Sequence, residues 1–209
     1  MIRRAFALAL AAAALTATLA APLPGAAIAA PSPAPARDDM SLGNPKARVT
    51  VVEYASVGCP HCAAWGVEVW PQFKKTYVDT GKVRFVYREM ITGNPTLAGA
   101  GFLLARCAGP SRYFQVVDGV YRAQAQIMQS GDAYAPLVKI AKDAGLTEDQ
   151  FNACLHDDGQ IKALQARAKQ AEEDGVNSTP TFVVNGKHIE GETTLAALGQ
   201  AIAQASRRK

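Results

Sequence analysis

The chain of 209 residues has few cysteines, little net charge, and no apolar run beyond its first 21 residues that is long enough to cross a membrane. Four cysteines are too few for a small domain built on disulfides. The 22 basic and 18 acidic residues leave a net charge of +4, which excludes the dense basic field that attracts nucleic acids and acidic membranes. With 49% hydrophobic and 19% charged residues, the chain is neither disordered nor a multi-pass membrane protein. One or two compact domains remain.

The N-terminus has the pattern of a secretory signal peptide. Residues 1–4 include two arginines, residues 5–21 are almost entirely apolar, and prolines and a glycine follow at 22–25. We expect cleavage after Ala29. A retained membrane anchor is the alternative, but 17 alanine-rich residues are marginal where a span needs about 20. The two arginines are weak evidence for the twin-arginine route, so we expect general export and a periplasmic or secreted protein.

Composition divides the remainder into a tether and one folded domain. Residues 31–35 are prolines separated by serine and alanine, without apolar periodicity, which predicts a flexible tether over 30–39. The folded domain is expected over 40–209, with a helical insertion at about 95–174. Removal of the signal peptide leaves 180 residues, enough for one domain with a sizeable core.

The first part of this domain predicts two strands joined by a helix. Residues Arg48–Tyr54 are β-branched and largely apolar, and Lys82–Tyr87 alternates polar and apolar side chains. Between them, residues 59–77 have apolar side chains at helical spacing, with Pro71 as an expected kink. Strand, helix and strand in this order form a right-handed crossover unit.

The insertion at 95–174 predicts five helices and no strand. Their expected ranges are Thr96–Cys107, Tyr113–Met128, Pro136–Ala144, Thr147–Leu155 and Gln160–Glu173. After them, Thr181–Val184 and Lys187–Glu190 predict a hairpin, because Asn185-Gly186 between them is the preferred type I′ turn. An amphipathic helix over Thr193–Ala205 then closes the chain.

The residues Cys59-Pro60-His61-Cys62 follow the first buried strand and begin the next helix. The sulfur of Cys59 is therefore expected among the unpaired N–H groups of a helix N-terminus, where a thiolate is favoured. A protonated or donating ring of His61 would add a second attraction. Both effects place the pKa of Cys59 below the free value of about 8.5. Cys62, turned toward the helix body, would be shielded and would act as the resolving partner.

Alternatives stay open for both cysteine pairs. The motif could be a plain structural disulfide or a zinc half-site, but zinc needs two more ligands, and His156 and His188 each lack a Cys or His partner. We therefore expect no metal. Cys107 and Cys154 lie 47 residues apart and would oxidise outside the cytoplasm, which predicts a structural disulfide. The alternative is two buried thiols that pack as small hydrophobic side chains.

Four segments together resemble the DsbA-like branch of the thioredoxin superfamily. They are Gly43-Asn44-Pro45, Val49–Tyr54, Cys59–Cys62 and Thr179-Pro180-Thr181-Phe182. The resemblance extends over nearly all of the expected mature chain. It implies an α/β thioredoxin fold, a mixed sheet flanked by helices, with the helical insertion over the active-site face.

The resemblance also implies roles for individual residues. Cys59 would exchange with the substrate, and Cys62 would resolve the mixed disulfide. Pro180 matches the cis-proline of the family, which lies against the motif and pairs with the substrate backbone, and Thr179 precedes it. An ordinary trans proline at the start of a strand is the alternative for Pro180.

Glu53 is an acidic residue in an otherwise apolar strand, where an unpaired carboxylate is costly. In the resembling family this position holds a buried acid near the resolving cysteine, which implies a proton relay to and from Cys62. The alternative is a strand-end glutamate that reaches solvent or pairs with Lys82 or Arg84. With the four residues of the motif, Glu53 completes the set of candidate catalytic residues.

The expected function is an exported thiol-disulfide oxidoreductase that introduces disulfides into other proteins. We expect no cofactor and no nucleic acid; the partners would be cysteine-containing proteins and a redox protein that restores the disulfide. One alternative is a disulfide isomerase or reductase, because Thr179 also occurs in isomerase-like relatives. Such isomerases usually dimerise through an added N-terminal domain, and residues 30–44 are too few to form one. The other alternative is a non-redox peptide-binding chaperone, against which the presence of both Cys59 and Cys62 argues.

Overall fold

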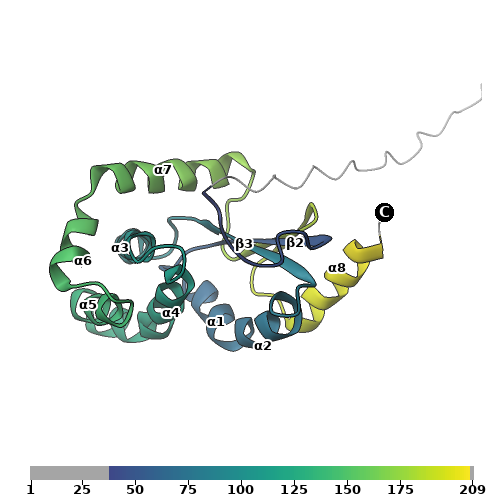
Figure 1. Cartoon of the computed structure of the whole chain (residues 1–209), viewed down its shortest axis with the longest axis horizontal. Helices are drawn as coiled ribbons and strands as arrows, with labels where there is room; N and C mark the ends of the chain where they lie inside the picture. Colours follow the sequence, from purple (N-terminus) through teal and green to yellow (C-terminus); the bar gives the residue numbers. More distant parts are fainter. Residues whose placement is uncertain (1–37, 208–209) are drawn as a thin grey trace, which may run out of the picture.

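The computed structural model describes residues 38–207 (Figure 1). The expected signal peptide, its cleavage site and residues 30–37 lie outside the described residues. Asp38 and Asp39 were expected in the flexible tether over 30–39, but both contact the folded domain. The carboxylate of Asp39 lies 3.1 Å from the guanidinium of Arg88, and the carbonyl of Asp38 accepts a hydrogen bond from Arg106 at 2.8 Å.

A mixed sheet of five strands forms the centre of the domain. The strands are β1 (Met40–Gly43), β2 (Val49–Ala55), β3 (Val83–Glu89), β4 (Thr181–Val184) and β5 (Lys187–Glu190). Their order is β1-β3-β2-β4-β5, and only β2 and β3 are parallel neighbours. The sequence did not predict β1, because Met-Ser-Leu-Gly has no β-branched residue. Its pairing with β3 forms this edge strand.

The helix expected over 59–77 is divided into three short elements. They are α1 (Pro60–Glu68), α2 (Trp70–Phe73) and the π-helical turn η1 (Lys74–Val78). The break falls at Val69, just before the expected kink at Pro71. Pro71 has no N–H to donate to the carbonyl four residues earlier, so the first helix ends there.

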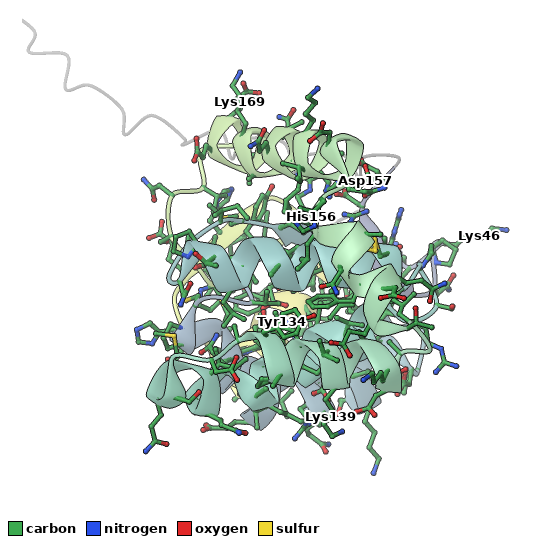
Figure 2. All side chains as sticks on the ribbon, turned by 90° about the vertical axis from the view of Figure 1, so that its left-hand side faces the viewer. Lys46, Tyr134, Lys139, His156, Asp157 and Lys169 are labelled. Atoms are coloured by element: carbon green, nitrogen blue, oxygen red, sulfur yellow. A yellow bond between two sulfur atoms is a disulfide. The ribbon has the colours of Figure 1, made fainter. Side chains whose placement is uncertain are left out.

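The insertion contains the five expected helices, with each end within two residues of its predicted position. They are α3 (Pro95–Cys107), α4 (Tyr113–Ser130), α5 (Tyr134–Asp143), α6 (Glu148–Leu155) and α7 (Asp158–Glu173). Figure 1 shows α3, α4, α5 and α6 to one side of the sheet, with α7 running along the top of the view toward β3, which it contacts. Figure 2 shows this face, with Tyr134 between neighbouring helices and Lys139 and Lys169 extending outward. The side chain of Thr147 caps α6, because it accepts a hydrogen bond from the N–H of Gln150.

One hydrophobic core runs from the sheet into the insertion, and it includes Val51, Phe85, Phe102, Val116 and Phe151. The insertion is therefore packed onto the sheet and does not form a separate unit. The chain closes with α8 (Leu195–Arg207), which contacts β2 and β4 beside the hairpin.

Candidate active site

The turn between β2 and α1 positions the two cysteines of the motif. Cys59 is the residue before the helix, with an extended backbone, and Pro60 takes the first helical position. Both Cys59 and Cys62 are free thiols in the structure. Cys59 is 6% exposed, whereas Cys62 is fully buried. Only the sulfur at the N-terminus of the helix can therefore be reached from outside.

The two thiols differ strongly in acidity. The pKa of Cys59 is lowered from 9.0 to about 5, mainly by a hydrogen bond from the thiol of Cys62. Burial opposes this effect, and the side chain of Thr179 and the backbone N–H groups of Cys62 and His61 add to it. Burial raises the pKa of Cys62, and the neighbouring thiolate raises it further. At neutral pH, Cys59 is a thiolate and Cys62 is a thiol.

The ring of His61 pairs with a carboxylate, and among the described residues its Nδ1 atom makes no hydrogen bond to Cys59. Its ring is exposed, and its Nδ1 atom lies 2.5 Å from Oε1 of Glu192. The backbone N–H of His61, not its ring, is what contributes a hydrogen bond to the acidity of Cys59. The ring acts on Cys59 through charge alone, since the thiolate raises the pKa of His61. Glu192 lies 131 residues from His61 in the chain and was not predicted as part of the site.

The loop before β4 lies against the motif. The peptide bond between Thr179 and Pro180 is cis. The carbonyl oxygen of Thr179 lies 3.4 Å from the sulfur of Cys59, and its hydroxyl lies 2.6 Å from that of Thr92. The carbonyl of Pro180 accepts a hydrogen bond from the N–H of Gly191 at 2.8 Å. Residues far apart in the chain thus converge on one sulfur atom.

Two further segments hold the backbone of the turn. The N–H of Asn94 donates to the carbonyl of Gly58 at 2.9 Å. A Cβ atom on Gly93 would lie 2.1 Å from that same oxygen, so a side chain cannot fit there. From α4, the buried amide of Gln124 donates to the carbonyls of Val57 and Cys59 at 2.8 and 3.2 Å. Gln124 was not predicted from the sequence, although a glutamine on the apolar face of a helix is a detectable signal.

Glu53 is buried at 2% exposure, and its Oε1 atom has no hydrogen-bond partner among the described residues. Both sequence alternatives, a solvent-exposed side chain and a pair with Lys82 or Arg84, are therefore wrong. Burial raises the pKa of Glu53 to about 8. The side chain lines a cavity of about 20 Å³ together with Trp65 and Tyr87, which is large enough for one water molecule.

The other pair, Cys107 and Cys154, is joined by a disulfide with an S–S distance of 2.05 Å, which links the end of α3 to α6. Among residues 38–207, no cluster of three or more His, Cys, Asp or Glu side chains is arranged to hold a metal ion. Within the same range, no helix is long and apolar enough to cross a membrane.

Comparison with known families agrees with the fold. A family model described as thioredoxin matches residues 36–204. The chain belongs to the thioredoxin superfamily. Its similarity to proteins named for disulfide chemistry places it in the DsbA-like branch. The mixed sheet with its helical insertion is accordingly a DsbA-like thioredoxin fold.

Two relatives from Rickettsia carry the provisional name protein-disulfide oxidoreductase. The Rickettsia conorii protein is 35% identical over 151 residues, which are 71% of this chain and 54% of the relative. The Rickettsia bellii protein is 31% identical over 176 residues, which are 82% of this chain and 67% of the relative. The chain thus spans little more than half the length of the first of these thioredoxin relatives.

Two solved structures share this DsbA-like fold. Wolbachia pipientis alpha-DsbA1 superposes with a TM-score of 0.73 at 25% identity, over 82% of this chain and 92% of that one. A protein-disulfide isomerase from Novosphingobium aromaticivorans superposes with a TM-score of 0.67 at 25% identity, over 81% and 98%.

Proposed function

We propose that the protein is an exported thiol-disulfide oxidoreductase that introduces disulfides into other proteins. The observation that carries this proposal is the difference in acidity between Cys59, with a pKa of about 5, and Cys62, whose pKa is raised. A stabilised thiolate favours the reduced form of the pair, so the Cys59–Cys62 disulfide would be a good oxidant.

In the proposed reaction, a substrate thiolate attacks the sulfur of Cys59 in the oxidised protein. The bond between the two motif sulfurs breaks, and its electron pair goes to Cys62, which takes up a proton. A second substrate thiolate then attacks the substrate sulfur of the mixed disulfide and expels Cys59. Because its pKa is about 5, the Cys59 thiolate is a good leaving group. The substrate gains a disulfide, and the protein leaves as a dithiol.

Glu53 is the proposed source of the proton that Cys62 needs. Its raised pKa of about 8 keeps the buried carboxyl protonated at neutral pH. A charge on Glu53 would raise the pKa of Cys62, which supports an electrostatic interaction between the two buried groups. The carbonyl of Thr179 borders the sulfur of Cys59, and Thr179 and Pro180 are proposed to pair with the substrate backbone. A redox partner outside this chain would restore the disulfide.

The test is the reduction potential of the Cys59–Cys62 pair in glutathione buffers, with the fraction reduced measured by alkylation and mass spectrometry. A potential well above the value of about −270 mV for a reducing thioredoxin supports the oxidising direction. A potential at or below that value would overturn it. Oxidative refolding of a reduced substrate provides the activity, with Cys59→Ser as the inactive control.

Disulfide isomerisation is a second candidate, because the solved structure from Novosphingobium aromaticivorans carries the name of an isomerase. An isomerase must rearrange a substrate with scrambled disulfides when the motif is reduced. Recovery of such a substrate by the reduced protein, at a rate comparable to the oxidation of a reduced substrate, would favour the second candidate over the first.

A further inference from the structure

Glu192 lies beside the motif because its backbone is attached to the loop before β4. The residue before it, Gly191, has a positive φ of 76°, and its N–H donates to the carbonyl of Pro180 at 2.8 Å. The loop that contacts the sulfur of Cys59 and the turn that carries Glu192 are therefore held together. This attachment brings the carboxylate to 2.5 Å from the Nδ1 atom of His61.

This carboxylate controls the charge on the ring of His61. The hydrogen bond and the negative charge of Glu192 raise the pKa of His61, and the thiolate of Cys59 adds a smaller contribution in the same direction. Among the described residues, Glu192 and Cys59 are the groups whose charges act on the ring. The attraction is mutual, so a His61 cation must also stabilise the thiolate of Cys59.

We propose that Glu192 is a positioning residue for the redox motif: it keeps the ring of His61 protonated and orients it beside Cys59, and so favours the dithiol form. The proposal rests on the dithiol–disulfide exchange described above. The cation acts on one redox state only, because Cys59 carries a negative charge in the reduced protein and none in the disulfide. Without Glu192, His61 would lose its proton closer to neutral pH, and the reduced form would lose part of its stabilisation.

The experiment compares Glu192→Gln, His61→Ala and the double variant in the full chain. Glu190→Gln is the matched control, because it removes the same charge from an exposed position two residues earlier. The first measurement is the NMR titration of His61, assigned among the three histidines by its loss in His61→Ala. The second is the equilibrium constant with glutathione as a function of pH.

In Glu192→Gln, we expect His61 to titrate at a lower pH than in the wild type. At neutral pH, the equilibrium constant with glutathione should favour the dithiol about two- to fivefold less than in the wild type. An effect of this size is usual for an exposed charge pair. The equilibrium constant with glutathione should also vary with pH over the range in which His61, no longer paired with Glu192, loses its proton. In the His61→Ala background, the same substitution should have no effect, and Glu190→Gln should leave both quantities unchanged.

Two results would overturn the proposal. If Glu192→Gln has the same effect with and without His61, the carboxylate acts by its own charge or by fixing the turn. If the titration of His61 does not move, Glu192 does not control the ring. If the proposed function is wrong, the Cys59–Cys62 pair will instead have a reduction potential as low as that of a reducing thioredoxin. The effect of Glu192 on the pH titration of His61 can still be measured in that case.

Discussion

Glu53 and Cys62 share the apolar interior behind the motif, where a charge on the carboxyl raises the pKa of the thiol. Burial keeps both groups protonated at neutral pH, since Glu53 has a pKa of about 8 and that of Cys62 is raised above its ordinary value. Cys59, at the mouth of the same site, is ionised. The motif therefore separates a reactive thiolate from a protonated interior, and exchange at one sulfur requires proton transfer at the other.

The acidity of Cys59 should depend on the hydrogen bond from Cys62. In Cys62→Ala, the pKa of Cys59 should rise by about one unit or more above its value of about 5, because the largest stabilising contact of the thiolate is lost. Cys62→Ser, which keeps a donor, should retain most of the shift. Thiolate absorbance as a function of pH measures both variants. Equal pKa values in the alanine and serine variants would show that the hydrogen bond is not the cause.

Glu53→Gln should stabilise the folded protein at neutral and alkaline pH. The carboxyl loses its proton at its ordinary pKa of 4.5 in the unfolded chain and at about 8 in the folded protein. The free energy of unfolding of the wild type should therefore fall as the pH rises between these values, while that of the variant stays flatter. The difference at pH 8 should be about 3–5 kcal/mol.

Urea denaturation of the disulfide form measures this difference without a contribution from the motif thiols. Glu68→Gln is the matched control, because Glu68 is exposed on α1. The interpretation of Glu53 as a buried neutral acid fails if the wild type and Glu53→Gln lose stability in parallel over this pH range.

Gly93→Ala should damage the turn that carries Cys59. A Cβ atom there would lie 2.1 Å from the carbonyl oxygen of Gly58, in addition to the cost of a positive φ of 72°. Gly109→Ala is the control, because its φ is 83° and its Cβ would meet no atom within 4 Å. We expect a loss of about 1–2 kcal/mol for the control and about 3 kcal/mol or more for Gly93→Ala. Similar losses in both variants would show that the close approach of the two loops is unimportant.

Removal of the disulfide between Cys107 and Cys154 should lower stability without changing the motif. The bond closes a loop of 47 residues, so the double alanine variant should lose about 3–4 kcal/mol in the free energy of unfolding. The pKa of Cys59 should stay at about 5, because neither cysteine of this bridge contributes to it. A shifted titration of Cys59 in the double variant would show that the bridge also supports the active site.

The sequence by itself determined the features that depend on neighbouring residues. The spacing of apolar side chains predicted all five insertion helices, and Asn185-Gly186 predicted the turn in which both residues have positive φ. The order of strand, cysteine motif and helix identified the candidate site. These patterns are readable because helix periodicity, capping and turn geometry are local properties of the chain.

The tertiary structure alone decided the contacts between distant segments. It formed β1 by pairing with β3, although the residues of β1 have low strand propensity. It turned His61 toward Glu192 and buried Glu53, whose Oε1 atom has no hydrogen-bond partner within residues 38–207. A sequence pattern shows that a charged residue lies in a strand or a motif. Which group faces that residue is decided by packing between segments that can be more than 100 residues apart in the chain. The acidity of the site depends on those distant neighbours, because charges and burial act through space and not along the chain.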